Sequence, residues 1–139
     1  MLKKLVISII TIFLMWGCSN ETIDIEALSK SIYESCNKEM VLLDKDQASA
    51  ILFIDDISEC YVYLPTDNSA DIVAVIKGNN SEIEKGIKQY IESLKQTSAM
   101  YDPKEITKID NYLLVNKDDV TIFVINDNID NIEKIIKGQ

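Results

Sequence analysis

The sequence has no histidine and no arginine, and its 139 residues include only four glycines and two prolines. Without histidine, the chain lacks the usual general base at neutral pH and the imidazole ligand of many zinc sites. Its 14 cationic side chains are all lysines, and 23 acidic residues bring the net charge to −9. Because phosphate recognition needs clustered cations, this composition argues against a nucleic-acid partner.

Apolar residues make up 47% of the sequence. This fraction is too high for a disordered chain, and the sequence contains neither a repeat nor a low-complexity tract. The length suits one domain. We therefore expect a single globular fold.

The N-terminus begins with a charged pair, Lys3 and Lys4, followed by an uncharged apolar stretch from Leu5 to Trp16 and then Gly17-Cys18. A helix of about 13 residues rises only about 20 Å, whereas the hydrocarbon core of a bilayer is roughly 30 Å thick. The stretch is thus short for a membrane span and typical of a secretory signal. We predict a signal peptide at residues 1–17.

The segment Leu14–Cys18 resembles a bacterial lipobox, in which a small residue precedes the cysteine. The resemblance implies that Cys18 is diacylated and becomes the first residue of the mature protein. Two acyl chains are enough for stable membrane anchoring. An ordinary signal peptide and an uncleaved anchor remain the alternatives. After Cys18 we expect a short tether at residues 18–21 and one domain at residues 22–139.

Hydrophobic spacing predicts an α+β fold with a four-stranded antiparallel or mixed sheet and packed helices, in the order α-α-β-β-α-β-β-α. Strands 72–76 and 120–125 are apolar on both faces, so helices should cover both sides of part of the sheet. The expected elements are helices at 22–38 and 46–53, strands at 57–64 and 70–77, a long helix from 81, a short helix after 103, strands at 111–115 and 120–125, and a final helix after 128.

Local signals refine the helices. Ser81 is a good N-cap for the long helix. Asp102 as N-cap, followed by Pro103 at the first helical position and Glu105 three residues after the cap, predicts the start of the short helix. Gly86 lies inside the long helix, where glycine costs about 1 kcal/mol relative to alanine. We therefore expect a close contact at Gly86.

An alternating strand at Tyr61–Pro65 is followed by Ala70–Val75, which opens the second strand. Gln96 and Tyr101 lie near the end of the long helix, and the segments Tyr112–Val115 and Val120–Val124 make the closing hairpin. In these features the chain from Ile54 to Ile136 resembles a family of bacterial lipoproteins that carry domain of unknown function 4358. This resemblance implies an extracytoplasmic location and an uncharacterised role, and it supplies no catalytic residue.

Cys36 and Cys60 remain if Cys18 is acylated. They could form a disulfide outside the cytoplasm. Both, however, fall at apolar positions of their helical and strand patterns, where cysteine serves as a small buried residue. We expect two free thiols.

The remaining sequence motifs indicate neither a metal site nor a catalytic site. The acidic segments lack the spacing, glycine and distal glutamate of an EF-hand. Two of the three lie at predicted turns or helix starts, where aspartate is expected for capping alone, so we predict no metal site and no cofactor. Ser35 and Lys38 match Ser-x-x-Lys without its companion motifs, which indicates chance. The acidic segments are Asp55-Asp56, Asp118-Asp119 and Asp127–Asp130.

We therefore expect a lipid-anchored extracytoplasmic lipoprotein on the cell membrane, acting as a non-enzymatic binding or interaction domain. Its partners would be the membrane, through the N-terminal lipid, and a protein or wall fragment. One alternative is an enzyme that uses carboxylates such as Asp71 with Glu59 on cell-wall sugars. Another is a sugar- or peptide-binding module in which Tyr61, Tyr63 and Tyr112 form an aromatic platform.

Overall fold

A computed structural model describes residues 22–138 as an α+β fold built around one antiparallel sheet. The sheet has five strands, not the four expected, in the order β1-β2-β3-β5-β4. All neighbouring strands are antiparallel, so the mixed alternative is wrong. The strands are β1 (Met40–Leu42), β2 (Ile57–Pro65), β3 (Ile72–Gly78), β4 (Leu113–Lys117) and β5 (Val120–Ile125).

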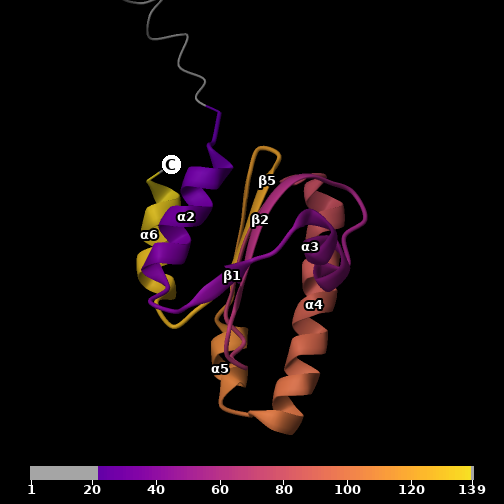
Figure 1. Ribbon diagram of the computed structural model, residues 1–139, viewed down its shortest axis with the longest axis vertical. Helices are drawn as coiled ribbons and strands as arrows, with labels where there is room; N and C mark the ends of the chain where they lie inside the picture. The colour runs from indigo at the N-terminus through magenta and orange to yellow at the C-terminus, as the bar shows by residue number, and fades with distance from the viewer. Residues whose placement is uncertain (1–21, 139) are drawn as a thin grey trace, which may run out of the picture.

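Helices lie on both sides of this sheet (Figure 1). One side carries α2 (Ile25–Ser35) and α6 (Ile129–Lys137), and the other carries α3 (Lys45–Leu52) and α4 (Asn80–Tyr101). The short helix α5 (Glu105–Asp110) lies at one end of the sheet, beside the C-terminal end of α4. The order of elements is as predicted, except for the additional strand β1 between α2 and α3.

The missed strand β1 has only three residues and pairs with the end of β2, Val41 opposite Leu64. Three consecutive apolar residues show neither the twofold alternation of a strand nor the period of a helix. Pairing with β2 therefore defines β1 as a strand, and no local pattern marks it.

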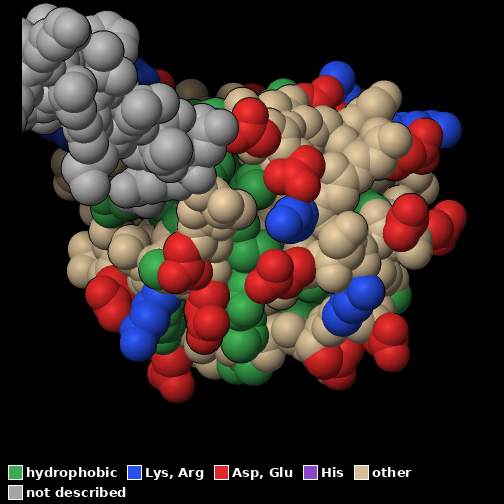
Figure 2. Space-filling view, turned by 90° about the horizontal axis from the view of Figure 1, so that it is seen from above, with side chains coloured by type: hydrophobic (Ala, Val, Ile, Leu, Met, Phe, Trp, Pro, Cys, Tyr) green, Lys and Arg blue, Asp and Glu red, His purple; other side chains and the backbone are tan. Residues whose placement is uncertain are grey.

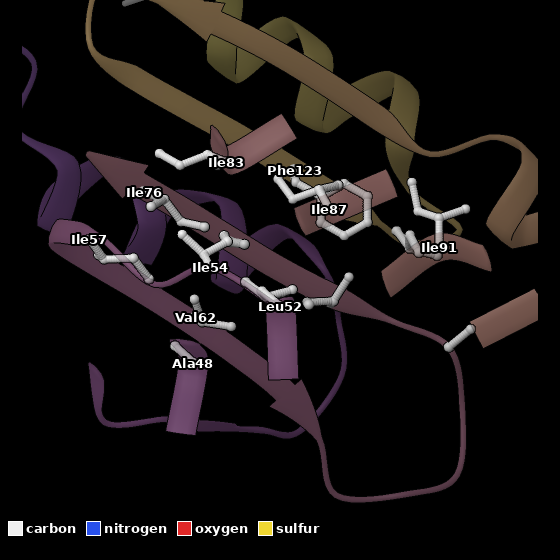
Figure 3. Packing of buried hydrophobic residues seen from close by; sticks show 14 of the residues in the cluster. Ala48, Leu52, Ile54, Ile57, Val62, Ile76, Ile83, Ile87, Ile91 and Phe123 are labelled. Carbon is white, nitrogen blue, oxygen red and sulfur yellow. The ribbon is translucent and has the colours of Figure 1, made fainter. Parts of the chain in front are cut away.

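The two faces of the sheet support two separate hydrophobic cores. Alternate residues of β3 and β5 enter each core, and every residue of β5 is buried. Ile76, Ile87 and Phe123 lie in the core beneath α3 and α4 (Figure 3), whereas Val73 and Ile122 lie in the core beneath α2 and α6. The prediction that helices cover both sides of these strands is confirmed.

Gly86 makes the close contact expected of it. A Cβ atom at this position would lie 2.4 Å from the Leu52 carbonyl oxygen and 2.9 Å from that of Phe53. These are backbone atoms and cannot rotate away. Gly86 therefore allows α4 to cross the C-terminal end of α3 at backbone contact.

Two helix starts differ from prediction. Asn79, not Ser81, is the N-cap of α4, and its side-chain oxygen accepts from the backbone N–H groups of Ser81 and Glu82. Asp102 ends α4 rather than starting the next helix, because the residue before Pro103 disfavours helical backbone angles. The helix α5 then begins at Glu105 without a side-chain cap.

Candidate functional site

A buried carboxylate, Asp71, lies where β3 begins. Its side chain is 1% exposed and both of its oxygens are bonded. Oδ2 accepts from the ammonium groups of Lys38 at 3.0 Å and Lys108 at 3.1 Å, and Oδ1 accepts from the Asn126 amide at 2.9 Å. Asp71 thus joins the segment after α2, helix α5 and the end of β5.

The two lysines extend the cluster towards solvent. Lys38 also donates to the Ser69 hydroxyl at 2.6 Å and pairs with Asp67 at 3.1 Å. Lys108 pairs with Glu105 at 3.0 Å, and the exposed carboxylate of Asp127 lies 3.7 Å away. We refer to these residues as the Asp71 network: Lys38, Asp67, Ser69, Asp71, Glu105, Lys108, Asn126 and Asp127.

The network also satisfies backbone groups at this end of the sheet. Glu105 accepts from the N–H of Ala70 at 3.0 Å. Asn126 donates to the Cys36 carbonyl oxygen at 3.3 Å and accepts from the N–H of Asn128 at 2.8 Å. These bonds fix loops from distant parts of the sequence onto one end of the sheet.

Charge pairing decides the ionisation of the network. Burial opposes ionisation of Asp71, but hydrogen bonds from Ser69, Lys38 and Lys108 hold its pKa below the ordinary aspartate value. Burial opposes the charge of Lys108, yet bonds to Glu105 and Asp71 raise its pKa. At neutral pH the carboxylate is therefore ionised and the ammonium protonated, which suits a structural ion cluster better than proton transfer.

A second feature lies on the α2 side of the sheet, along β1 and β2. The rings of Tyr33 and Tyr63 stack with centroids 4.7 Å apart and planes 6° from parallel. Tyr61 shares this face of β2, and Leu42 lies directly opposite Tyr63 on β1. We call these four residues the tyrosine ledge. The tyrosines are half-buried and Leu42 is 49% exposed, so helix α2 covers the ledge incompletely.

Carboxylates lie at one end of the ledge, beside Tyr61. The Tyr61 hydroxyl donates to Glu59 at 3.3 Å. Partial burial, followed by the nearby charges of Glu26 and Glu59, raises the pKa of Tyr61. The ledge thus combines aromatic faces with negative charge, which is a favourable setting for a cationic group.

The structure separates the carboxylates proposed as an enzymatic pair. Glu59 lies opposite Lys77 near the end of β3, whereas Asp71 precedes the first residue of that strand. Six residues of extended chain span about 20 Å. Asp71 and Glu59 are therefore far beyond the 5 to 9 Å that a glycosidase pair requires.

The predicted platform of three tyrosines is not assembled. Tyr61 and Tyr63 share one face of the sheet, but Tyr112 makes an edge contact with Phe123 in the core on the other face. The two remaining cysteines are also separated, since Cys36 is buried beneath α2 and Cys60 packs into the opposite core. Both thiols are free, as expected.

The remaining residues considered from the sequence do not form a site with one another. The Ser35 hydroxyl donates to the Ser31 carbonyl oxygen, while Lys38 is bound to Asp71, so the Ser-x-x-Lys match forms no pair. Within residues 22–138, no three acidic or cysteine side chains form a group that could hold a metal ion. Asp55-Asp56, Asp118-Asp119 and Asp127–Asp130 occupy the loop before β2, the β4–β5 turn and the start of α6.

The end of the molecule that carries Thr22 lies opposite the Asp71 network (Figure 1). Acidic side chains predominate in the view onto this end (Figure 2). A shallow pocket of about 230 Å³ lies here, and its ionisable lining is mostly carboxylate. Its charged residues are Asp24, Glu59, Lys77, Asp118 and Asp119.

Cys18, the predicted signal peptide at residues 1–17 and the predicted tether at residues 18–21 lie outside the described residues. In the part of the chain from 22 to 138, no helix has the length and apolar character needed to cross a bilayer.

Sequence reasoning did not identify the partners of Asp71. Lys38, Lys108 and Asn126 lie 33, 37 and 55 positions from it, and no spacing rule connects them. The available signal was an aspartate directly before the apolar run Ile72–Ile76, where an unpaired charge would be costly.

Comparison with known proteins gives a family match. The family model described as Domain of unknown function (DUF4358) matches residues 37–126, well over half of the chain. The matched range begins just before Lys38 and ends at Asn126, so it contains most of the Asp71 network. No curated protein and no solved structure matches the chain.

Proposed function

Since the chain belongs to the DUF4358 family, we propose that it is a lipoprotein held by lipid on the extracytoplasmic face of the cell membrane. Its folded part is a non-enzymatic domain that binds a partner there. The observation that carries the binding role is the tyrosine ledge, an aromatic and acidic surface that the helices leave partly open.

The anchor rests on the N-terminal sequence. Lys3 and Lys4 precede an apolar stretch that ends in Gly17-Cys18, and only three residues separate Cys18 from Thr22. A diacylglycerol on Cys18 would hold the domain close to the bilayer, with the end that carries Thr22 facing it.

The charge of that end supports anchoring by acyl chains alone. Asp24, Asp118 and Asp119 lie there, and carboxylates do not attract anionic headgroups. Membrane attachment should therefore resist a high-salt wash, which would release a protein held by charge.

Mass spectrometry of protein extracted from membranes tests the anchor. We expect a mature N-terminus at Cys18 that carries the mass of a diacylglycerol, and loss of this form in Cys18→Ser. An unmodified mature N-terminus, or a retained Met1 in the native protein, would contradict the anchor.

The binding role is tested in cells by placing a photo-crosslinking amino acid at Leu42. The matched control places it at Met100, which is 75% exposed and lies at the end of α4, away from the ledge. We expect a discrete crosslinked product from position 42 and none from position 100. Equal labelling at the two positions would argue against a binding role for the ledge.

A wall-fragment ligand is the second candidate, because tyrosine faces such as those of Tyr61 and Tyr63 can stack on sugar rings. Titration with purified muropeptides distinguishes it from a protein partner. A saturable change in tyrosine fluorescence that Tyr61→Ala abolishes would favour the wall fragment.

A further inference from the structure

The outer edge of β1 offers unpaired backbone groups in the described fold. The Glu39 carbonyl oxygen accepts from the N–H of Thr66 at 3.3 Å, and the N–H of Leu43 donates to the Val62 carbonyl oxygen at 2.8 Å. Backbone groups alternate in direction along a strand, so those of Glu39, Val41 and Leu43 face β2. The N–H and C=O groups of Met40 and Leu42 consequently face away from the sheet.

The side chains at this edge do not protect it. Val41 is 54% exposed and Leu42 is 49% exposed. Edge strands are normally guarded by lysine, proline or a bulge, and β1 contains none of these. The only protective feature of β1 is its short length, which still leaves room for one short strand to be added.

The tyrosine ledge lies beside the same edge. A strand added along β1 places every second side chain on the ledge face, next to Leu42. A long side chain at that position extends over Leu42 towards Tyr63. The carboxylates of Glu26 and Glu59 lie near Tyr61, and the whole chain carries a charge of −9. These groups favour a cationic side chain on the bound strand.

We propose that the β1 edge binds an extended segment of a partner protein, which adds a sixth strand to the sheet and directs a lysine or arginine side chain onto the tyrosine ledge. The backbone of Met40 and Leu42 would supply affinity, and the ledge would supply selectivity. This inference rests on the proposed binding role and names the chemical class of its partner.

The test uses the full chain in detergent micelles and a dye-labelled, end-blocked peptide of alternating lysine and valine, with fluorescence anisotropy as the readout. We expect saturable binding that weakens at least tenfold for the same peptide with glutamate in place of lysine. Absence of saturable binding up to about 1 mM, an affinity of only about 4 kcal/mol, would overturn the proposal.

Leu42→Pro is the decisive variant. Proline removes the outward N–H of Leu42 while leaving the bonds between β1 and β2, and edge strands tolerate proline at such positions. We expect binding by Leu42→Pro to be at least tenfold weaker than binding by Leu42→Thr, because both variants lose the leucine side chain and only Leu42→Thr keeps the N–H. Equal binding by Leu42→Pro and wild type, with both proteins folded by circular dichroism, would overturn the proposal.

Peptide chemistry provides a test that leaves the protein unchanged. N-methylation of alternate peptide amides removes donors from one edge of the added strand. Methylation of the amides that face β1 should abolish binding, and methylation of the amides that face away from β1 should preserve it. Equal loss in both registers would indicate an ionic contact without strand addition and would contradict the proposal.

Failure of this inference is distinguishable from failure of the proposed function. Anchoring is measured by the mass of Cys18, which Leu42→Pro does not alter. Suppose that the ledge crosslinks a partner in cells and that Leu42→Pro still binds the peptide normally. The binding role would then stand, and strand addition would be excluded as the way in which the partner binds.

Discussion

At the scale of single residues, Asp71 is the one charged side chain that is buried among the described residues. Its carboxylate pairs with two partly buried ammonium groups. Removing one partner of a buried ion pair leaves uncompensated charge and typically costs 3–5 kcal/mol. We expect Asp71→Ala to lower the free energy of unfolding by about 3 kcal/mol, measured by urea denaturation.

The control for Asp71 is Asp127→Ala, in the same network. The Asp127 side chain is 85% exposed and lies 3.7 Å from Lys108. Exposed pairs contribute little, so we expect a change below about 0.5 kcal/mol. Equal losses in the two variants would show that burial of Asp71 does not govern its contribution.

The lowered pKa of Asp71 also predicts a pH dependence. A carboxylate whose pKa is lower in the folded state stabilises the fold above its unfolded pKa of about 3.9, and this contribution is lost as the pH falls through the folded pKa. The difference in unfolding free energy between wild type and Asp71→Asn should therefore be larger at pH 7 than at pH 2.5. A constant difference between these pH values would contradict an ionised Asp71.

Gly86 has a steric role. Alanine at this position improves helix propensity by about 1 kcal/mol, but its Cβ would overlap the carbonyl oxygens of Leu52 and Phe53. We expect Gly86→Ala to destabilise by about 1–3 kcal/mol in thermal or urea unfolding. Gly138→Ala is the control, since its Cβ would lie 3.5 Å from the nearest atom. A stabilised Gly86→Ala variant would contradict the close crossing of α3 and α4.

Residue-level prediction from the sequence succeeded where the signal was local. The helix context of Gly86 was sufficient to predict a contact, although not its partner. The pairing within the Asp71 network has no local signal because its members come from four separate segments. Only the folded chain brings them together.

At the scale of elements, the start of α4 depends on Asn79. Its side-chain oxygen accepts from two backbone N–H groups, whereas Ser81 contributes its backbone to this cap. We expect Asn79→Ala to lower the free energy of unfolding by about 1 kcal/mol and Ser81→Ala to change it by much less. Thermal unfolding monitored by circular dichroism measures both. The opposite ranking would place the cap at Ser81.

Most elements were predictable because apolar residues recur with the period of a helix or a strand. The boundaries of β5 and the start of β2 were correct, and α3 was displaced by one residue. The exception, β1, is too short to show a period. Its position at the sheet edge depends on pairing with β2, which a linear pattern does not encode.

At the scale of the whole molecule, the two cores share β3 and β5 and should unfold together. Ile122 points into one core and Phe123 into the other. We expect Ile122→Ala and Phe123→Ala each to cost about 2–5 kcal/mol and to retain a single unfolding transition. Far-ultraviolet circular dichroism and tyrosine fluorescence should give the same midpoint. Separate midpoints would mean that the layers are independent.

The pairing of β3 with β5 has a consequence for the moment at which the chain can fold. These strands are roughly fifty residues apart in sequence, so the central ladder closes a long loop. Neither layer can be completed until Val120–Ile125 has left the ribosome. Under the secretion proposed above, a translocation pore would receive the chain while it is still unfolded, before β5 completes the sheet.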